Sequence, residues 1–523
     1  MQAPEETLAV NDVSAPEIVS KPAIMSKRAE IAAAFVAALA VMSWIQFAGP
    51  AILDNDGYYH IRWAEMLRES APRLPRFQAL PLTTLDERDY ADHHFLFHVL
   101  LVPFTLGDQR VGAKLAAAFF ASAGIASLFG LLVAYRVPWR WLWLAPLLAS
   151  SEPFLYRMSM TRAPGLSLAL LGIAAYLVLQ RKLLLIGLVA FAFTWAYSLF
   201  PLILAFALMH SIAAYVAERR IDFAQALAAF SGIVLGLVVN PYFPQNLALF
   251  RAHLSMKLAA TFPVAVGGEW YPYDTWELLS GSAAAFAIYA VALLAFDFRN
   301  RARDVKPLFF LLVSVIFLLM FFKSKRFVEY WPPFAVTFAA FVLSPAIASF
   351  VRAKYARTRD RVAAITGAFA VVAVLAVSMV MMTLWARADV RQEADPLAYQ
   401  GASEWLERNA PVGARVFNTD WDDFPMLFYY NPGNEYVAGL DPTYLYDRDP
   451  ELWKLYARIT LGEESNPASL IRERFGSEYV FTDNSHTPFL RVATESGDFE
   501  TVYRDRYCTV LWIRLSSERQ GGR

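Results

Sequence analysis

Cysteine is almost absent from this chain of 523 residues, which contains only Cys508. A single cysteine cannot form an intramolecular disulfide, and it excludes a cysteine-rich zinc or iron–sulfur site. Charged residues are also few, at 18%, whereas soluble proteins contain about 25%. The 47 basic and 47 acidic side chains balance. Because nucleic-acid-binding proteins usually carry a basic excess, we expect no nucleic-acid partner.

Apolar and aromatic residues, in contrast, make up 57% of the chain, with 40 phenylalanines, 24 tyrosines and 14 tryptophans. This content exceeds what one soluble core requires, and it indicates an integral membrane protein. Residues 1–28 form an Ala-, Pro-, Glu- and Ser-rich tail that we expect to be disordered and cytoplasmic. Residues 29–386 are then the transmembrane domain, and residues 387–523 a separate soluble domain.

Eleven stretches are candidates for membrane spans, each of which needs about 20 apolar residues. They are residues 31–53, 111–134, 141–152, 164–179, 183–200, 201–217, 223–240, 279–296, 307–322, 327–351 and 362–386. Residues 95–106 are too short to cross and suit a re-entrant or interfacial segment. The eleven spans then place five basic loops on one side, which is the cytoplasmic side because Lys and Arg concentrate there.

This topology puts the N-terminus in the cytoplasm and three segments on the outer face. The segments are loop 54–110, loop 241–278 and the C-terminal domain. We expect the inner membrane of a bacterium, with the C-terminal domain in the periplasm. That domain alternates helical stretches (397–409, 450–462, 467–475) with β-type runs (415–418, 435–440, 478–482, 509–515). The fold class is therefore a polytopic α-helical membrane protein with a C-terminal soluble α/β domain.

Acids and histidines gather in the first outer loop. Asp54, Asp56 and His60 follow the first span directly, and Asp92, His93, His94 and His98 come later in the loop, which holds four of the seven histidines. Carboxylates and imidazoles can bind a divalent metal such as Mg²⁺ or Mn²⁺, or move a proton. The alternatives are that an aspartate caps the following helix and that the histidines pack structurally.

Two groups of cations face the same side. Arg157 and Arg162 follow Glu152, and Lys323, Lys325 and Arg326 precede Glu329. Outward-facing cations run against the inside-positive trend, so they need a partner, and a phosphate group would supply one through forked hydrogen bonds. For Arg157 and Arg162 the alternative is a salt bridge to Glu152 or to an acid of the first loop. For the cluster at 323–326 it is snorkelling of long side chains to the interface.

Two further polar segments lie in the outer regions. Glu269, in the second loop, either enters this site or is a solvated loop acid. In the C-terminal domain, Asp420-Trp421-Asp422-Asp423 follows a β-type run. This sequence is either a recognition loop or a turn, because Asp is a turn former.

Taken in this order, the motifs resemble the catalytic subunit of oligosaccharyltransferases and the wider GT-C class of membrane glycosyltransferases. Asn55-Asp56-Gly57-Tyr58 resembles the first-loop motif whose Asp coordinates metal and activates the acceptor, and Glu269 resembles the loop Glu that completes that site. Arg326-Phe327 resembles an Arg-Phe step that contacts the lipid-linked donor. Asp420-Trp421-Asp422 resembles a degenerate Trp-Trp-Asp motif for acceptor binding.

The chain departs from the family at two places. The second acidic motif should lie a few residues after Arg157, where this chain has Arg162-Ala163-Pro164-Gly165-Leu166 without an acid, and Asp420 replaces the first Trp of the acceptor motif. The clustering of Asp92, His93 and His94 leads to the hypothesis that they substitute for the missing acids as metal ligands beside Asp56.

The sequence therefore predicts a glycosyltransferase that moves a sugar or oligosaccharide from a polyprenyl-(di)phosphate donor to a glycan, lipid or protein acceptor. Asp56 and Glu269 are the expected catalytic residues, Arg157 and Arg326 bind the donor phosphate, and Trp421 and Asp422 bind the acceptor. Two alternatives stay open, a secondary transporter and a non-catalytic protein of glycan assembly or acceptor binding. A transporter would carry its polar residues near the bilayer midplane.

Overall fold

The structure is a computed structural model that describes residues 25–258, 264–298, 304–353 and 358–514. Residues 1–24 of the tail predicted at 1–28 lie outside the described residues. Helix α1 (Lys27–Gln46) begins within the end of that predicted tail and is capped by Ser26, whose hydroxyl oxygen accepts a hydrogen bond from the Ala29 amide at 3.2 Å. It ends seven residues before the predicted end of the first span at residue 53.

Six of the described helices are long and apolar enough to cross a membrane, and the number rises to eight if each of two bent pairs is one span. The chain is thus an integral membrane protein. The six are α1, α4 (Gln109–Ala134), α9 (Pro201–Glu218), α14 (Val305–Lys323), α15 (Trp331–Ala353) and α16 (Thr358–Gln392). The bent pairs are α6 (Glu152–Ser159) with α7 (Pro164–Leu179), and α12 (Thr275–Gly281) with α13 (Ala283–Ala295).

The other expected spans correspond to shorter helices. Helices α8 (Leu183–Ala196) and α10 (Ala224–Val238) have 14 and 15 residues, about 21–23 Å at 1.5 Å per residue, which is less than the roughly 30 Å of a hydrocarbon core. The stretch at 141–152 contains most of η2 (Arg140–Trp143), all of α5 (Leu144–Ala149) and the first residue of α6. The total of eleven spans stays a prediction.

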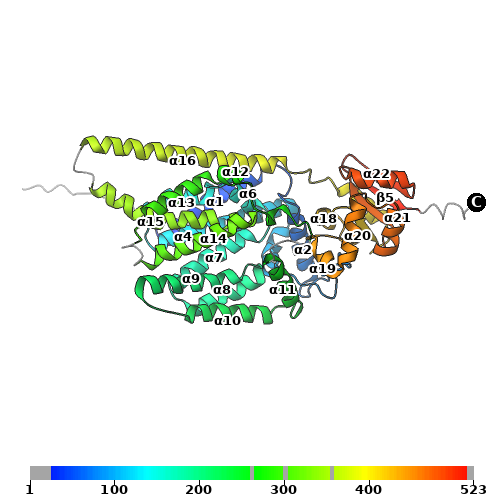
Figure 1. The fold of residues 1–523 in the computed structure, drawn as a ribbon, viewed down its shortest axis with the longest axis horizontal. Coiled ribbons are helices and arrows are strands. Elements are labelled where there is room, and N and C mark those ends of the chain that lie inside the picture. Colours follow the sequence, from blue (N-terminus) through cyan, green and yellow to red (C-terminus); the bar gives the residue numbers. More distant parts are fainter. Residues whose placement is uncertain (1–24, 259–263, 299–303, 354–357, 515–523) are drawn as a thin grey trace, which may run out of the picture.

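Close helix packing builds this part of the molecule, in which the long helices run side by side (Figure 1). Helices α8 and α10 approach so closely that a Cβ on Gly232 would lie 2.1 Å from the carbonyl oxygen of Gly187. Two short helices, α3 (Phe95–Leu101) and η1 (Val102–Thr105), form the predicted non-crossing segment of the first outer loop. Helix α2 (Asp56–Ser70) opens that loop, and α11 (Gln245–Leu258) and η3 (Gly268–Trp270) belong to the second.

The C-terminal domain lies at one end of the helix bundle (Figure 1) and contains a five-stranded sheet with the order β2-β1-β3-β5-β4. Strand β1 pairs in parallel with β2 and β3, whereas β5 pairs antiparallel with β3 and β4. The strands are β1 (Arg415–Asn418), β2 (Glu435–Tyr436), β3 (Tyr479–Asp483), β4 (Phe499–Arg504) and β5 (Cys508–Ile513). The run predicted at 435–440 is thus a strand of two residues, and β4 was not predicted.

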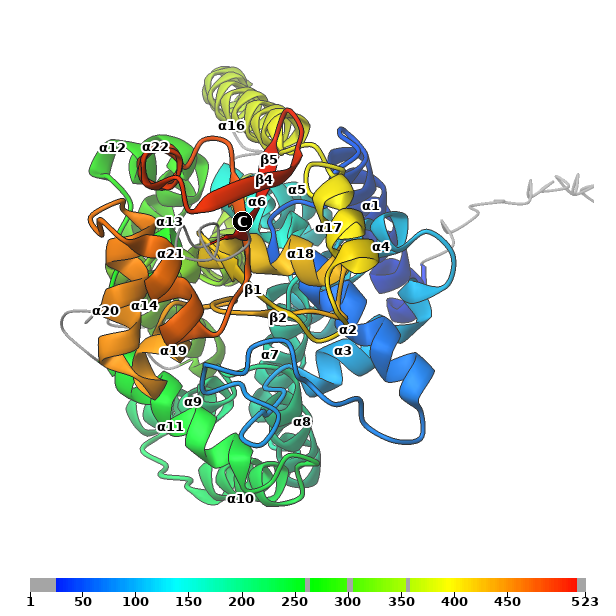
Figure 2. The same ribbon diagram turned by 90° about the vertical axis from the view of Figure 1, so that its right-hand side faces the viewer.

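Helices surround this sheet (Figure 2). They are α17 (Gln400–Asn409), η7 (Trp421–Asp423), α18 (Phe424–Tyr430), α19 (Thr443–Arg448), α20 (Pro450–Thr460), α21 (Pro467–Leu470), η8 (Ile471–Phe475) and α22 (Thr487–Ser496). The sequence predicted α17, α20 and the region of α21 and η8, but not α18, α19 or α22.

An aromatic cluster joins the C-terminal domain to the first outer loop. Tyr59 and Phe77 of the loop pack with Phe424 and Phe428 of α18, with ring centroids 5.6 to 6.5 Å apart. Helices α2 and α18 therefore lie against each other, and the strand-end loop after β1 is held directly over the start of α2.

Candidate active site

A break between α6 and α7 forms one wall of the site. The two helices bend by 109° at this break. Ser151 caps α6, because its hydroxyl oxygen accepts a hydrogen bond from the Phe154 amide at 3.3 Å, and Pro164 opens α7, where its missing N–H costs nothing. Arg157 lies in the last turn of α6, and Arg162 lies in the turn between the helices.

Arg157 is almost fully buried and pairs with two acids. Its Nε donates to Oε1 of Glu329 at 2.8 Å, its Nη2 contacts the same oxygen, and its Nη1 donates to Oε2 of Glu269. Glu329 belongs to η5 (Lys325–Glu329), just before α15, and is completely buried. These bonds fix the guanidinium between the second outer loop and η5.

Arg162 is the centre of the acidic side. Its Nε and Nη2 donate to the two carboxylate oxygens of Asp54 at 2.5 and 2.8 Å, Nη2 lies 2.8 Å from Oδ2 of Asp56, and Nη1 donates to Oε2 of Glu269 at 3.1 Å. Asp54 reaches this position with a left-handed backbone (φ 71°), which Asp tolerates better than most residues. The sequence singled out Arg162 only as one of several outward cations.

The second outer loop brings in Glu269 through η3. Its backbone carbonyl accepts a hydrogen bond from the Ser324 hydroxyl at 2.8 Å. Arg326 lies on the other side of the Glu269 carboxylate, with its Nη1 3.4 Å from Oε1 of Glu269. Its Nη2 donates a hydrogen bond to the Tyr197 hydroxyl at 3.2 Å. The Arg326 guanidinium also lies 4.6 Å from the Trp270 ring centre. Glu269 thus joins Arg157, Arg162 and Arg326.

Four carboxylates face three guanidiniums in this network, so one negative charge is in excess. The pKa of Asp56 is raised to about 7, chiefly by burial, against the opposing effect of Arg162 and with smaller contributions from the negative charges of Asp54, Asp422 and Glu269. Glu269 is different: burial raises its pKa, but Arg326, Arg157 and Arg162 together hold it well below its usual value. Asp56 is therefore the acid of the network that can exchange a proton near neutral pH.

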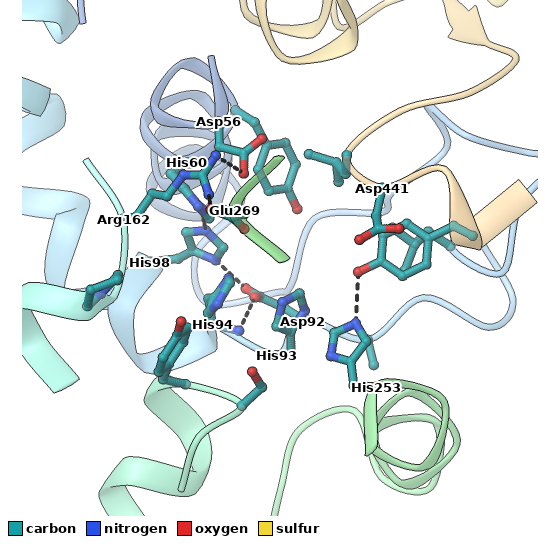
Figure 3. A pocket seen from close by; sticks show the side chains of 18 of the residues that line it. Asp56, His60, Asp92, His93, His94, His98, Arg162, His253, Glu269 and Asp441 are labelled. Atoms are coloured by element: carbon teal, nitrogen blue, oxygen red, sulfur yellow. Dashed lines mark hydrogen bonds and ion pairs between the residues drawn. The ribbon is translucent and has the colours of Figure 1, made fainter. Parts of the chain in front are cut away.

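Histidines form the opposite side of the site (Figure 3). Nδ1 of His98 lies 2.7 Å from Oδ2 of Asp92, and Nε2 of His98 lies 2.7 Å from Nδ1 of His60. The same Asp92 oxygen accepts a hydrogen bond from the Trp63 indole at 3.1 Å. His60 follows Asp56 by four residues, so the two share one face of α2.

Two cavities meet at this network. The histidine pocket, of about 110 Å³, is lined by five histidines, 60, 93, 94, 98 and 253, and by Tyr197 and Arg326. The acidic pocket, of about 640 Å³, is lined by Glu152, Asp389, Trp421 and Asp422 among others. Seven residues line both cavities: Asp56, Arg157, Arg162, Glu269, Trp270, Leu440 and Asp441.

The predicted acceptor residues lie over the start of α2. Asn55 donates a hydrogen bond from Nδ2 to the backbone carbonyl of Asp422 at 3.1 Å and another to its carboxylate at 3.3 Å. Trp421 approaches Gly267, where an added Cβ would lie 3.9 Å from its ring. Lys325, by contrast, pairs with Glu277 at 3.4 Å.

The site does not fit the metal-ligand set predicted at Asp56, Asp92, His93 and His94. Asp56 is paired with Arg162, and Asp92 is engaged by His98 and Trp63. Within the part of the chain that the structure describes, no group of three or more His, Cys, Asp or Glu residues is arranged to hold a metal ion. A bound divalent metal stays a prediction, and we derive no chemical step through it.

The sequence named Asp56, Glu269, Arg157 and Arg326 for this site, and the structure brings all four together. It did not assign Asp54, Tyr197 or Asp441 to the site. Asp54 was visible as a neighbour of Asp56, but nothing in the sequence around Tyr197 or Asp441 marks them as pocket residues.

No protein-family model and no curated protein matches the chain. Solved structures do match. An oligosaccharyltransferase of Archaeoglobus fulgidus, tethered to an acceptor peptide, matches with a TM-score of 0.59 at 13% identity over 92% of this chain and 74% of that chain. ArnT of Cupriavidus metallidurans bound to undecaprenyl phosphate matches with a TM-score of 0.58 at 15% identity over 92% and 97%. The same ArnT without ligand matches with a TM-score of 0.57 at 14% identity over 93% and 98%.

At these identities the likeness concerns the fold. The helix bundle, the two long loops and the C-terminal α/β domain have the arrangement of the GT-C membrane fold, as the sequence predicted. The chain is a polytopic membrane protein of the GT-C fold.

Proposed function

We propose that the chain is a membrane glycosyltransferase that moves a sugar from a polyprenyl-(di)phosphate donor to an acceptor on the outer face of a bacterial inner membrane. The observation that carries this proposal is the pair of cavities that share Asp56, Arg157, Arg162 and Glu269 as a common wall. A two-substrate transfer needs two such cavities, with the reacting atoms meeting at the wall between them.

The donor phosphate belongs in the histidine pocket. Arg326 lines that pocket and not the acidic pocket, and its ion pair with Glu269 is the longest made by the three arginines, at 3.4 Å. Its guanidinium is therefore the one that can turn most easily toward a phosphate oxygen. Arg157 lines both cavities and adds a second positive charge. The ArnT structure with undecaprenyl phosphate supports a lipid-linked donor for this fold.

The acceptor belongs in the acidic pocket, where Trp421 and Asp422 of the C-terminal domain form part of the lining. The stacking face of a tryptophan and the oxygens of a carboxylate are groups that hold a sugar or a polar chain. The archaeal oligosaccharyltransferase is tethered to an acceptor peptide, which supports an acceptor site in this fold. The acceptor of this chain is a glycan, a lipid or a protein.

In the proposed transfer, Asp56 accepts the proton of the acceptor O–H or N–H, and the acceptor atom attacks the anomeric carbon of the donor sugar. The bond between that carbon and the phosphate oxygen breaks, and its electron pair stays on the phosphate. Arg326 and Arg157 stabilise the charge that develops there. Glu269 holds both arginines in position, so it contributes to catalysis by orienting them.

The test is mass spectrometry of surface glycans, glycolipids and glycoproteins from a strain that lacks this chain. We expect a glycoconjugate to disappear and to return with the native chain and with Glu69→Gln, an exposed acid on the same helix. Asp56→Asn, expressed at the native level, should reduce the product by roughly 10²-fold or more, because a general base contributes about 10² to 10⁴.

Two results would contradict the proposal. Full restoration by Asp56→Asn would favour a non-catalytic assembly protein. Unchanged glycoconjugates together with lost uptake of a solute would favour a transporter, although the polar site here lies between the bundle and the C-terminal domain rather than within the bundle.

A further inference from the structure

Three carboxylates converge on the single guanidinium of Arg162. They come from two segments: Asp54 and Asp56 lie two residues apart at the start of α2, and Glu269 belongs to η3. The side chain of Arg162 is 16% exposed. Converging carboxylate oxygens are the usual ligands of a hard divalent cation, and here the cation is a side chain.

The charge of the site gives a second argument. Asp56 and Glu269 are the acids that the family resemblance assigns to a metal site, and Arg162 begins the segment in which the resemblance expects another acid. A divalent cation together with one carboxylate carries a single net positive charge, and so does one guanidinium. An arginine at residue 162 therefore leaves the net charge of the site unchanged while removing both the metal and its third ligand.

The geometry of the Arg162 side chain agrees with the replacement of a metal ion by a guanidinium. Each of the three nitrogens of the Arg162 guanidinium contacts a carboxylate, at distances from 2.5 to 3.1 Å. The guanidinium is planar, keeps its charge and donates in a fixed fork, so it can hold three acids in one orientation. A metal ion would have to displace it to reach the same oxygens.

We propose that Arg162 takes the place of a divalent cation in this site, so that Asp54, Asp56 and Glu269 are held by a guanidinium and the chain needs no bound metal. The inference rests on the proposed function only in its final part, which concerns transfer. The binding part concerns Arg162 and its three acids alone.

The test measures Mn²⁺ binding to the purified full chain in detergent, both by electron paramagnetic resonance of free Mn²⁺ and by thermal unfolding. The native chain should show no saturable site at millimolar Mn²⁺ and a change in Tm below about 1 °C. Arg162→Ala leaves three carboxylates without their counter-charge. This variant should bind about one Mn²⁺ and gain roughly 3 °C or more in Tm.

Arg448→Ala is the matched control, because Arg448 also bridges two acids, Asp86 and Asp89, at 3.1 Å each, but on the exposed surface. It should gain no saturable Mn²⁺ site. Arg162→Gln keeps most of the side-chain volume and replaces Arg162→Ala if the alanine variant does not fold. A native chain that binds Mn²⁺ as well as the variant overturns the proposal, and so does an absence of binding in both Arg162 variants.

The final experiment measures sugar transfer by the native chain with EDTA present. The native rate should change by less than about twofold, since the charge is supplied by a side chain rather than by an exchangeable ion. A loss of about tenfold or more that Mn²⁺ restores would overturn the proposal. A native chain without transfer under any condition would contradict the proposed function instead, and the Mn²⁺ measurements would still decide the role of Arg162.

Discussion

Asp56 is the residue whose charge state governs the proposed chemistry. Its pKa is about 7, because burial and the negative charges of Asp54, Asp422 and Glu269 raise it more than Arg162 lowers it. Only the deprotonated carboxylate can accept a proton from the acceptor. The rate should therefore rise with pH through about 7 and fall as the pH decreases below it.

The variant Asp422→Asn tests this electrostatic account. Removing a negative charge near Asp56 favours its ionised form, so its pKa falls and the acidic limb of kcat/KM moves to lower pH. The measurement is the pH profile of transfer by the variant and the native chain. Glu463→Gln makes the same charge change on the exposed surface, at a residue that lines neither pocket, and should leave the limb in place. An acidic limb that stays in place or moves upward in Asp422→Asn would contradict the account.

For individual residues, the sequence predicted four members of the site: Asp56, Arg157, Glu269 and Arg326. It did not predict which hydrogen bonds and ion pairs join them. Asp56 and Arg326 lie within short motifs, and a membrane setting makes an outward cation or acid conspicuous. Which arginine pairs with which acid depends on side-chain directions after folding. Glu329 shows this: it follows Arg326 by three residues, yet it is buried against Arg157 of a distant helix.

Among the elements, the start of α2 and the break between α6 and α7 determine the position of the site. Gly57 packs against this break, and an added Cβ would lie 2.5 Å from Cγ2 of Ile52 and 3.3 Å from Cβ of Thr161. Thr161 immediately precedes Arg162. The contact therefore sets the distance between Asp56 and Arg162.

Gly57→Ala should destabilise the chain by about 1–3 kcal/mol, which is the usual cost of overpacking. It should also reduce transfer, because α2 must shift away from the turn that carries Arg162. Thermal unfolding and a transfer assay on the same preparation measure both effects. Gly433→Ala is the control, since its Cβ would meet only Asn431 Oδ1, at an ordinary 3.5 Å. Equal stability and activity of Gly57→Ala and the native chain would show that the contact is unimportant.

The sequence predicted long elements better than short ones. Apolar runs near 111–134 and 307–322 are evident, because a bilayer requires a minimum length of apolar chain. The bend after α6 was not predicted: Pro164 indicates a helix start, but the direction of the next helix depends on packing. Strand β4 was missed as well, and it lies at the edge of the sheet with half-buried and exposed residues.

For the whole molecule, the important feature is that the C-terminal domain covers a polar site at the end of the helix bundle. Trp421 and Asp422 line the acidic pocket together with residues of α6 and α16. The aromatic contacts between α2 and α18 keep the domain in this position. Under the proposed function, the bundle holds the lipid donor and the C-terminal domain selects the acceptor.

Trp421→Ala tests this division of roles. It should raise the KM for the acceptor by roughly tenfold, a typical loss for a tryptophan at a binding surface, with little change in donor affinity. Steady-state kinetics with each substrate varied in turn provides the measurement. Trp276→Ala removes an exposed tryptophan of α12 that lines neither pocket and should leave both values near native. A change confined to the KM for the donor would contradict the assignment of Trp421 to the acceptor site.

The most direct test of the account is an experimental structure of the chain in a lipid nanodisc with a bound polyprenyl phosphate. We predict the phosphate in the histidine pocket, with its oxygens about 3 Å from the Arg326 guanidinium, and the acidic pocket on the far side of the wall that contains Asp56, Arg162 and Glu269. A phosphate bound away from Arg326 and Arg157, or in the acidic pocket beside Trp421, would contradict it.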